Sequence, residues 1–231
     1  MVLLLYNYTE HMLKTLDLTL GISSHTKLFP GYPQPIFIKW SRYDIQGYDS
    51  ETMFLSTHTG THMDAPSHFL LGSNSIDQFT TDRFVCNAVL FKLRRQSNEV
   101  ITYKNIIESG IDLKEKDTAV FFTGWAGHYK NDVNYITHNP GLSTDAANYL
   151  VEKKVNAVAI DSPGIDPGDD TNFNAHKILL SNNILIIENL CNLEKLHSER
   201  FMLVLAPLKL IGASGSPIRA IAIENIIDQN P

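Results

Sequence analysis

Cysteine is scarce in this sequence, with only Cys86 and Cys191 among 231 residues. The two lie far apart and show no Cys-x-x-Cys spacing, so they predict neither a disulfide framework nor a zinc site built from thiolates. We expect both to be buried free thiols. Any metal chemistry must therefore come from other side chains.

Long apolar runs and clustered basic residues are also missing. No stretch approaches the ~18 apolar residues of a membrane span, and the apolar run at 2–6 lacks the basic flank and length of a signal peptide. The net charge is −6, and basic pairs such as Arg94-Arg95 stand without interleaved aromatic residues. We expect a cytoplasmic protein that acts on a small molecule and has no membrane or nucleic-acid partner.

Linkers, internal repeats and low-complexity segments are absent as well. Apolar residues make up 43 % of the chain and charged residues 19 %, which is ordinary for a globular protein. A chain of 231 residues is long enough to bury a full core. We therefore predict a single domain over residues 1–231.

Short apolar, β-branched or aromatic runs recur along the chain and predict strands. Segments 103–109, 143–153 and 175–180 instead have helical character, and Ser143 is a candidate N-cap of the second. Strands outnumber helices, and the two clearest helices each precede a fully apolar strand, so we predict a mixed α/β fold with a sheet-rich core. The predicted strands lie at 35–40, 53–56, 88–93, 119–122, 156–160, 184–187, 202–205 and 220–223.

Histidine is concentrated in one segment, His58-Thr-Gly-Thr-His62-Met-Asp64-Ala-Pro-Ser-His68-Phe69. The i, i+4 spacing of His58 and His62 would suit a helical zinc site, but Gly60 and Pro66 oppose a helix. In an extended chain these donors would share one side, yet residues 58 to 64 would span ~20 Å. We therefore predict that the strand at 53–56 ends in a tight loop that carries the ligands.

Imidazole and carboxylate donors without a thiolate favour Zn²⁺, with Mn²⁺ or Fe²⁺ as alternatives. His58, His62 and Asp64 can form an open three-ligand site that leaves one position for water. His68 is then free to carry a proton, because an imidazole titrates near neutral pH. The alternatives for His68 are a fourth ligand or a partner that orients the ligands.

A second acidic cluster lies at 161–170 and is followed by His176 and Glu188. We interpret Asp169 and Asp170 as exposed residues of a Gly/Pro-rich turn. Glu188 ends an apolar run, where burial of its carboxylate without a cation would be costly. A metal ion near Glu188 would offset that cost.

These residues resemble the cyclase-type metal-dependent hydrolase family, which includes bacterial kynurenine formamidases (arylformamidases) and isatin hydrolases. The family motif is His, three residues, His, one residue, Asp, then Pro, one residue, His and Phe, and it is present without a gap from His58 to Phe69. The resemblance covers nearly the whole chain, continuing at 30–31, 140–143, 161–166, 176–190 and 207–219.

The resemblance implies a swivelling β/β/α fold and one or two divalent metal ions per subunit. A first ion would take His58, His62 and Asp64. A second would take His176 and Glu188, with Asp64 and Glu188 able to bridge the two. The last motif histidine would act in catalysis. The resemblance also implies a homodimer or homotetramer in which a neighbouring subunit helps to close the pocket.

The implied reaction is hydrolysis of an amide bond by metal-bound hydroxide, most directly in an arylformamide such as N-formylkynurenine from tryptophan catabolism. One alternative is hydrolysis of a cyclic amide, imide or ester, such as isatin or a lactone. Others are ring closure and metal-dependent ligand binding without turnover, against which the spare His68 argues. Tyr32 stands where kynurenine formamidases commonly have an acidic residue, which leaves the substrate open.

Four aromatic residues, Trp40, Phe69, Trp125 and Tyr129, are candidates for a substrate-binding wall. Their rings could stack on an aromatic substrate. Aromatic residues in strands or beside glycines are more often part of the core, so the wall is a hypothesis for the structure to locate.

Overall fold

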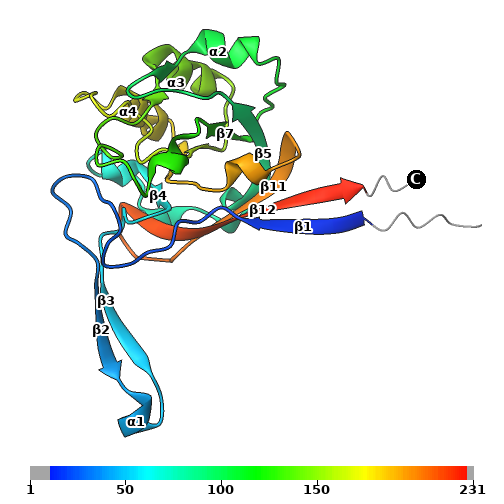
Figure 1. Ribbon diagram of the computed structural model, residues 1–231. Coiled ribbons are helices and arrows are strands. Elements are labelled where there is room, and N and C mark those ends of the chain that lie inside the picture. The colour runs from blue at the N-terminus through cyan, green and yellow to red at the C-terminus, as the bar shows by residue number, and fades with distance from the viewer. Residues whose placement is uncertain (1–10, 228–231) are drawn as a thin grey trace, which may run out of the picture.

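The computed structural model describes residues 11–227 (Figure 1). It shows a large curved sheet, helices on its outer side and a two-stranded arm, residues 36–54, that projects from the body. The apolar run at 2–6 lies outside the described residues. None of the described helices has the length and apolar character needed to cross a membrane. The strands are β1 (His11–Asp17), β2 (Ile36–Ser41), β3 (Ser50–Phe54), β4 (His62–Asp64), β5 (Val85–Lys92), β6 (Val100–Ile101), β7 (Thr118–Phe122), β8 (Gly141–Leu142), β9 (Ala157–Ile160), β10 (Leu185–Glu188), β11 (Arg200–Pro207) and β12 (Gly215–Ile227). The helices are α1 (Tyr43–Gln46), α2 (Tyr103–Glu108), α3 (Thr144–Glu152) and α4 (Asn174–Ser181), with 3₁₀ turns η1 (Pro66–His68), η2 (Ile76–Gln78), η3 (Thr81–Arg83), η4 (Trp125–His128) and η5 (Leu193–Lys195).

Seven strands of the large sheet close into a ring. Hydrogen-bonded neighbours run in the order β12-β11-β5-β7-β9-β10-β4, and β4 pairs back with β12. Strands β5, β7, β9 and β10 are parallel, whereas β4, β11 and β12 run antiparallel to their neighbours. β1 extends the sheet beside β12. Closure gives each of the seven strands two partners and fixes β4 between β10 and β12.

Residues along the parallel strands alternate between two apolar cores. In β9, Ala157 and Ala159 belong to the core inside the ring, to which all seven strands contribute. Val158 and Ile160 belong to the second core, which the sheet shares with α2, α3 and α4. Because both faces of these strands are buried, their sequences are continuously apolar rather than alternating.

The same alternation places the polar residues of β4. Met63 is fully buried in the core inside the ring, so His62 and Asp64 point to the opposite face. Ile187 of β10 also lies in the inner core, which puts Glu188 on that opposite face. The β4–β10 register pairs Glu188 with His62. Residues that are distant in sequence thus become direct neighbours.

The mixed α/β fold with a sheet-rich core, predicted from the sequence, is confirmed. Each predicted strand and helix has a counterpart, although β12 is much longer than the predicted run at 220–223. The strands β1, β4, β6 and β8 and the short helix α1 were not predicted. The expectation that His62 and Asp64 lie in a loop was wrong, because β4 is held as a strand by pairing on both sides.

The two cysteines form no disulfide, but the structure corrects the expectation of full burial. Cys86 and Cys191 are both only partly buried. Removal of water still raises the pKa of Cys191 to about 11 and raises that of Cys86. Both thiols are therefore protonated at neutral pH and poor nucleophiles.

The loop after β9 packs directly against the start of β8. A Cβ atom added to Gly141 would lie 2.3 Å from the carbonyl carbon of Asp166 and 2.6 Å from the carbonyl oxygen of Ile165. Asn139 holds the same loop, since its Nδ2 donates to the carbonyl oxygens of Gly164 (3.1 Å) and Asp166 (2.8 Å). This close backbone contact fixes the loop that carries Asp166.

We predict that Gly141→Ala lowers the free energy of unfolding by about 1–3 kcal/mol, because the new Cβ forces two backbones apart. Gly127→Ala is the matched control, since a Cβ there meets nothing within 4 Å. Urea denaturation of both variants measures the difference. Equal transition midpoints for the two would contradict the close packing.

Candidate metal centre

His62 is buried on β4 with one ring nitrogen anchored. Its Nδ1 lies 2.9 Å from the carbonyl oxygen of Gly60, to which it donates, so Nε2 remains free as a ligand. Gly60 makes this turn with φ of +64°, a conformation that glycine adopts without strain. His62 Nε2 lies 3.3 Å from Asp64 Oδ1 and 3.4 Å from Glu188 Oε2.

His176 lies in the first turn of α4 and approaches the same two carboxylates, Asp64 and Glu188. Asp166 Oδ1 accepts from the amide of Ala175 at 2.7 Å, so this carboxylate caps the helix. Asp166 Oδ2 accepts from His176 Nδ1 at 2.5 Å. His176 Nε2 then lies 3.2 Å from Glu188 Oε1 and 3.5 Å from Asp64 Oδ2. A carboxylate behind a ligand histidine fixes both its tautomer and its direction.

Asp64 and Glu188 are carboxylates that are nearly inaccessible to water, with exposed fractions of 1 % and 4 %. Glu188 Oε1 accepts from the amide of Ile165 at 2.7 Å. Among the described residues, Asp64 Oδ2 has no hydrogen-bond partner. An orphaned buried oxygen facing imidazole nitrogens would be costly without a cation. The donor set therefore fits a divalent metal ion.

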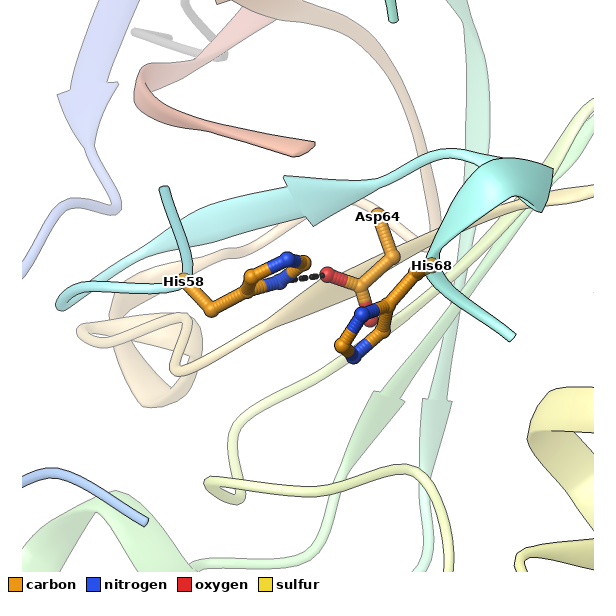
Figure 2. Close-up of side chains that lie close together, drawn as sticks. All are labelled: His58, Asp64 and His68. Atoms are coloured by element: carbon orange, nitrogen blue, oxygen red, sulfur yellow. Dashed lines mark hydrogen bonds and ion pairs between the residues drawn. The ribbon is translucent and has the colours of Figure 1, made fainter. Parts of the chain in front are cut away.

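His58 and His68 form a stacked pair beside Asp64, with ring centroids 3.9 Å apart and planes 24° apart. Figure 2 shows the three side chains and the contact of 2.6 Å between His58 Nδ1 and Asp64 Oδ1. His58 Nε2 lies 3.0 Å from Ser214 Oγ. Asp64 is common to two groups with metal-ligand spacing, one with His58 and His68 and one with His62 and Glu188. It is the centre of the cluster.

The pKa values of His62 and His176 are raised by the carboxylates around them. Burial opposes charge on His62, but Asp64 and Glu188 together raise its pKa to about 9. Burial also opposes charge on His176, yet its hydrogen bond to Asp166 and the nearby carboxylates of Asp64 and Glu188 raise its pKa well above the usual value. A metal ion must displace protons from these two rings, so metal affinity falls as the pH is lowered.

His68 behaves in the opposite way. Burial lowers its pKa to about 4, and the neighbouring His58 and His176 rings oppose its protonation further. The His68 ring is therefore neutral at pH 7 and has a lone pair with which to accept a proton.

A cavity of about 150 Å³ opens over the cluster. His68 and Glu188 are part of its lining, so both reach the space available to a substrate. Tyr32 also lines it, with its ring stacked on His58 at a centroid distance of 5.9 Å. The aromatic walls come from Phe29, Phe69 and Phe173.

Of the four aromatic residues predicted for the wall, the structure places Phe69 alone in the cavity lining. Trp40 is 74 % exposed on β2 in the arm. Trp125 is 3 % exposed, and its Nε1 donates to the carbonyl oxygen of Tyr135 at 2.9 Å. The Tyr129 hydroxyl accepts from the amide of Lys27. Trp40, Trp125 and Tyr129 thus lie outside the lining of this cavity.

Sequence reasoning missed several residues that the site uses. It assigned Asp166 no role, although the position of Asp166 after a buried strand was a usable signal. Phe29 and Phe173 carry no sequence signal, and Phe173 takes an unusual φ of +54°. Asp169 is exposed, as expected, whereas Asp170 reaches the cavity rim.

Comparison with known proteins identifies relatives along most of the chain. Residues 16–167 match the family described as putative cyclase. A kynurenine formamidase of Bacillus cereus is 28 % identical over 207 residues, which cover 89 % of this chain and 95 % of that protein. An isatin hydrolase of Roseibium aggregatum is 29 % identical over 209 residues, covering 80 % and 79 %. The structure of a predicted metal-dependent hydrolase from Bacillus stearothermophilus matches with a TM-score of 0.77 at 28 % identity, covering 92 % of this chain and 98 % of that one.

The fold and the buried ligand cluster define a protein of the metal-dependent hydrolase class. Within that class, the chain belongs to the putative cyclase family, as the motif from His58 to Phe69 predicted. The predicted enzyme class, a hydrolase of C–N bonds other than peptide bonds, agrees with both curated relatives.

We predict that Asp166→Asn weakens zinc binding by about 10- to 100-fold, because His176 loses the carboxylate that orients its ring and raises its basicity. Asn can still cap α4, which limits damage to the fold. Asp169→Asn, at an exposed position in the same loop, is the control. Competition with a chromogenic chelator measures the affinity. Wild-type affinity in Asp166→Asn would refute the orienting role.

Proposed function

We propose that this protein is a metal-dependent amidohydrolase that acts on an arylformamide, with N-formylkynurenine of tryptophan catabolism as the first substrate to test. The observation that carries the proposal is the buried set of imidazole and carboxylate donors around Asp64 Oδ2, under a cavity with aromatic walls. The kynurenine formamidase relative supports a formamide as the target. We place this activity in the cytoplasm.

We propose that His62, Asp64, His176 and Glu188 would hold one divalent ion, because their nitrogen and oxygen atoms converge. This grouping differs from the one that the family resemblance implied, in which His58, His62 and Asp64 take a first ion and His176 and Glu188 a second. His58, in contact with Asp64, would belong to a second position. Zn²⁺ suits these donors best, with Mn²⁺ and Fe²⁺ as alternatives. A bound ion would lower the pKa of a water molecule and would offset negative charge that develops during hydrolysis.

His68 is the residue that we assign to proton transfer. It lines the cavity and is neutral at pH 7 because burial lowers its pKa to about 4. A neutral imidazole can accept the proton of the attacking water and then donate it to the departing nitrogen. Asp64 lies beside the ring and favours the imidazolium form that exists between these two steps.

Opening of a cyclic amide, imide or ester is the second candidate. The isatin hydrolase relative is as similar to this chain as the kynurenine formamidase is. Tyr32 also favours this candidate, because its ring lies over His58 at the position where kynurenine formamidases commonly have an acidic residue. Ring closure and ligand binding without turnover remain alternatives that an activity measurement addresses.

A substrate panel tests the proposal. Zinc-loaded protein is assayed with N-formylkynurenine, isatin and a lactone, and kcat/KM is compared. We expect the formamide to give the highest value. A preference for isatin or the lactone would select the second candidate, and metal retention without hydrolysis of any substrate would select a binding protein.

We predict that His68→Ala retains zinc but loses at least about 100-fold in kcat, because proton transfer contributes roughly 10²–10⁴-fold to such reactions. His62→Ala should instead lose zinc, since it removes the ligand nitrogen itself. Elemental analysis and kcat measured on the same samples separate the two effects. Full activity and equal zinc content in both variants would overturn the assignment.

We also propose that the protein works as a homodimer, or a homotetramer built from it, through the arm of β2, α1 and β3. The two strands of the arm pair only with each other among the described residues. Large apolar side chains are exposed along it, including Ile38 (53 %), Tyr43 (73 %), Ile45 (67 %) and Met53 (61 %). An isolated two-stranded ribbon is marginal in water, and exposed apolar patches of this kind are typical of interfaces. A second copy of the chain is the occupant that we propose.

We predict that the double substitution Ile38→Asp, Ile45→Asp lowers the molecular mass in solution, because it places two charges in the apolar surface that a partner covers. Val133→Asp is the control, as Val133 is 92 % exposed and lies outside the arm. Analytical ultracentrifugation at micromolar concentration gives the masses. A monomeric wild-type protein would refute the proposal.

A further inference from the structure

Lys27 is part of the lining of the cavity. Its Nζ donates to the backbone carbonyl oxygen of Asp132 and lies 6.0 Å and 5.7 Å from the ring centroids of Tyr129 and Tyr135. No carboxylate of the described residues forms an ion pair with it, and the side chain of Asp132 instead lies 3.6 Å from His128. A lysine ammonium has three donors, so it retains unused hydrogen-bonding capacity.

The segment around Lys27 is held in place on several sides. Its backbone amide donates to the Tyr129 hydroxyl at 3.3 Å. The Tyr129 and Tyr135 rings pack edge to face at 5.2 Å, which fixes the surface under the ammonium. A lysine side chain is usually flexible, but this one has already lost much of its freedom. A cation held in this way binds an anion at a smaller entropic cost.

Tyr135 connects this charge to the metal centre. Its hydroxyl donates to Asn189 Oδ1 at 2.9 Å, and Asn189 directly follows Glu188 and lines the same cavity. One tyrosine ring therefore links the ammonium to the ligand cluster. The Phe69 and Phe173 rings, with centroids 5.5 Å apart, provide an aromatic wall of the same cavity. The cavity thus has the proposed ligands, an aromatic wall and Lys27 in its lining.

We propose that Lys27 is an anion subsite that binds a carboxylate on the substrate, away from the scissile bond. The inference rests on the proposed amidohydrolase function and narrows its substrate class to arylamides, formamides above all, that carry an acidic side chain. A charge-assisted hydrogen bond from the ammonium would hold that carboxylate. A neutral cyclic amide carries no anionic group that the Lys27 ammonium could bind.

Asp170 also lines the cavity, but among the described residues it forms no ion pair with Lys27. Its Oδ1 accepts from the amide of Asn172 at 2.6 Å, a hydrogen bond within its own turn. The competing role for Lys27 is a structural strap between the segment at 27–29 and the loop at 129–135. A strap would affect all substrates equally, whereas a subsite distinguishes acidic from neutral ones.

The test uses two substrates that differ only in charge: 4-(2-formamidophenyl)-4-oxobutanoate and its primary amide. We expect Lys27→Met to lower kcat/KM for the acid by about 10- to 100-fold, mainly through KM, and to change it for the amide by less than about 2-fold. Lys27→Arg should recover part of the loss, since it keeps the charge. Lys130→Met is the control, because Lys130 is an exposed lysine in the loop at 129–135 that Lys27 contacts.

Equal losses on both substrates would make Lys27 a strap, and no loss on the acid would remove it from the site. Either result leaves the proposed hydrolase function intact. If the zinc-loaded wild-type protein hydrolyses neither substrate, the proposed function fails, and calorimetric binding of the acid decides the subsite separately. Binding that is lost in Lys27→Met supports the subsite, and binding that is unchanged overturns it.

Discussion

The pairing of β4 on both sides is the constraint on which the rest of the site depends. Three residues, His62 to Asp64, hydrogen-bond to β10 on one edge and to β12 on the other, and so close the ring of strands. The approach of β12 requires glycine, because a Cβ at Gly215 would lie 2.6 Å from the Met63 carbonyl oxygen and 2.8 Å from His58 Cε1. With Met63 fixed inside the ring, His62 and Asp64 must face the side on which Glu188 lies. Backbone pairing thus sets the ligand geometry before any metal is considered.

This geometry opposes the stability of the fold unless a cation is present. Buried carboxylates with an unpartnered oxygen lose hydration that the surrounding protein only partly replaces. Two hydrogen bonds hold the cluster in place, one between His176 and Asp166 and one from the Ile165 amide to Glu188. A metal ion that binds only the native state would stabilise it by mass action. The same ion would provide the chemistry, so folding and function are coupled through one site.

The sequence predicted much of this structure, for identifiable reasons. The core strands were recognisable because burial on both faces makes their sequences continuously apolar. β4 was not, since Met63 is its only apolar residue and its strand character comes from its partners. The histidines that we propose as ligands stood out through their spacing, whereas the contacts of Asp166 and Lys27 form only in the folded chain. For Asp166 the one signal was its position after a buried strand. Trp125, an aromatic residue beside a glycine, was a candidate for the substrate wall but is buried in the protein.

The proposed ligands and the cavity walls come from different kinds of structure. His62, Glu188 and His176 lie on β4, β10 and α4, where backbone hydrogen bonds fix their positions. The walls come mainly from loops and turns, including Lys27, Phe29 and Phe173. Loops tolerate substitution better than paired strands do. Substitutions in such loops could change the shape and charge of the cavity without moving the residues on β4, β10 and α4. Specificity is therefore to be sought in the loop residues rather than in the ligands.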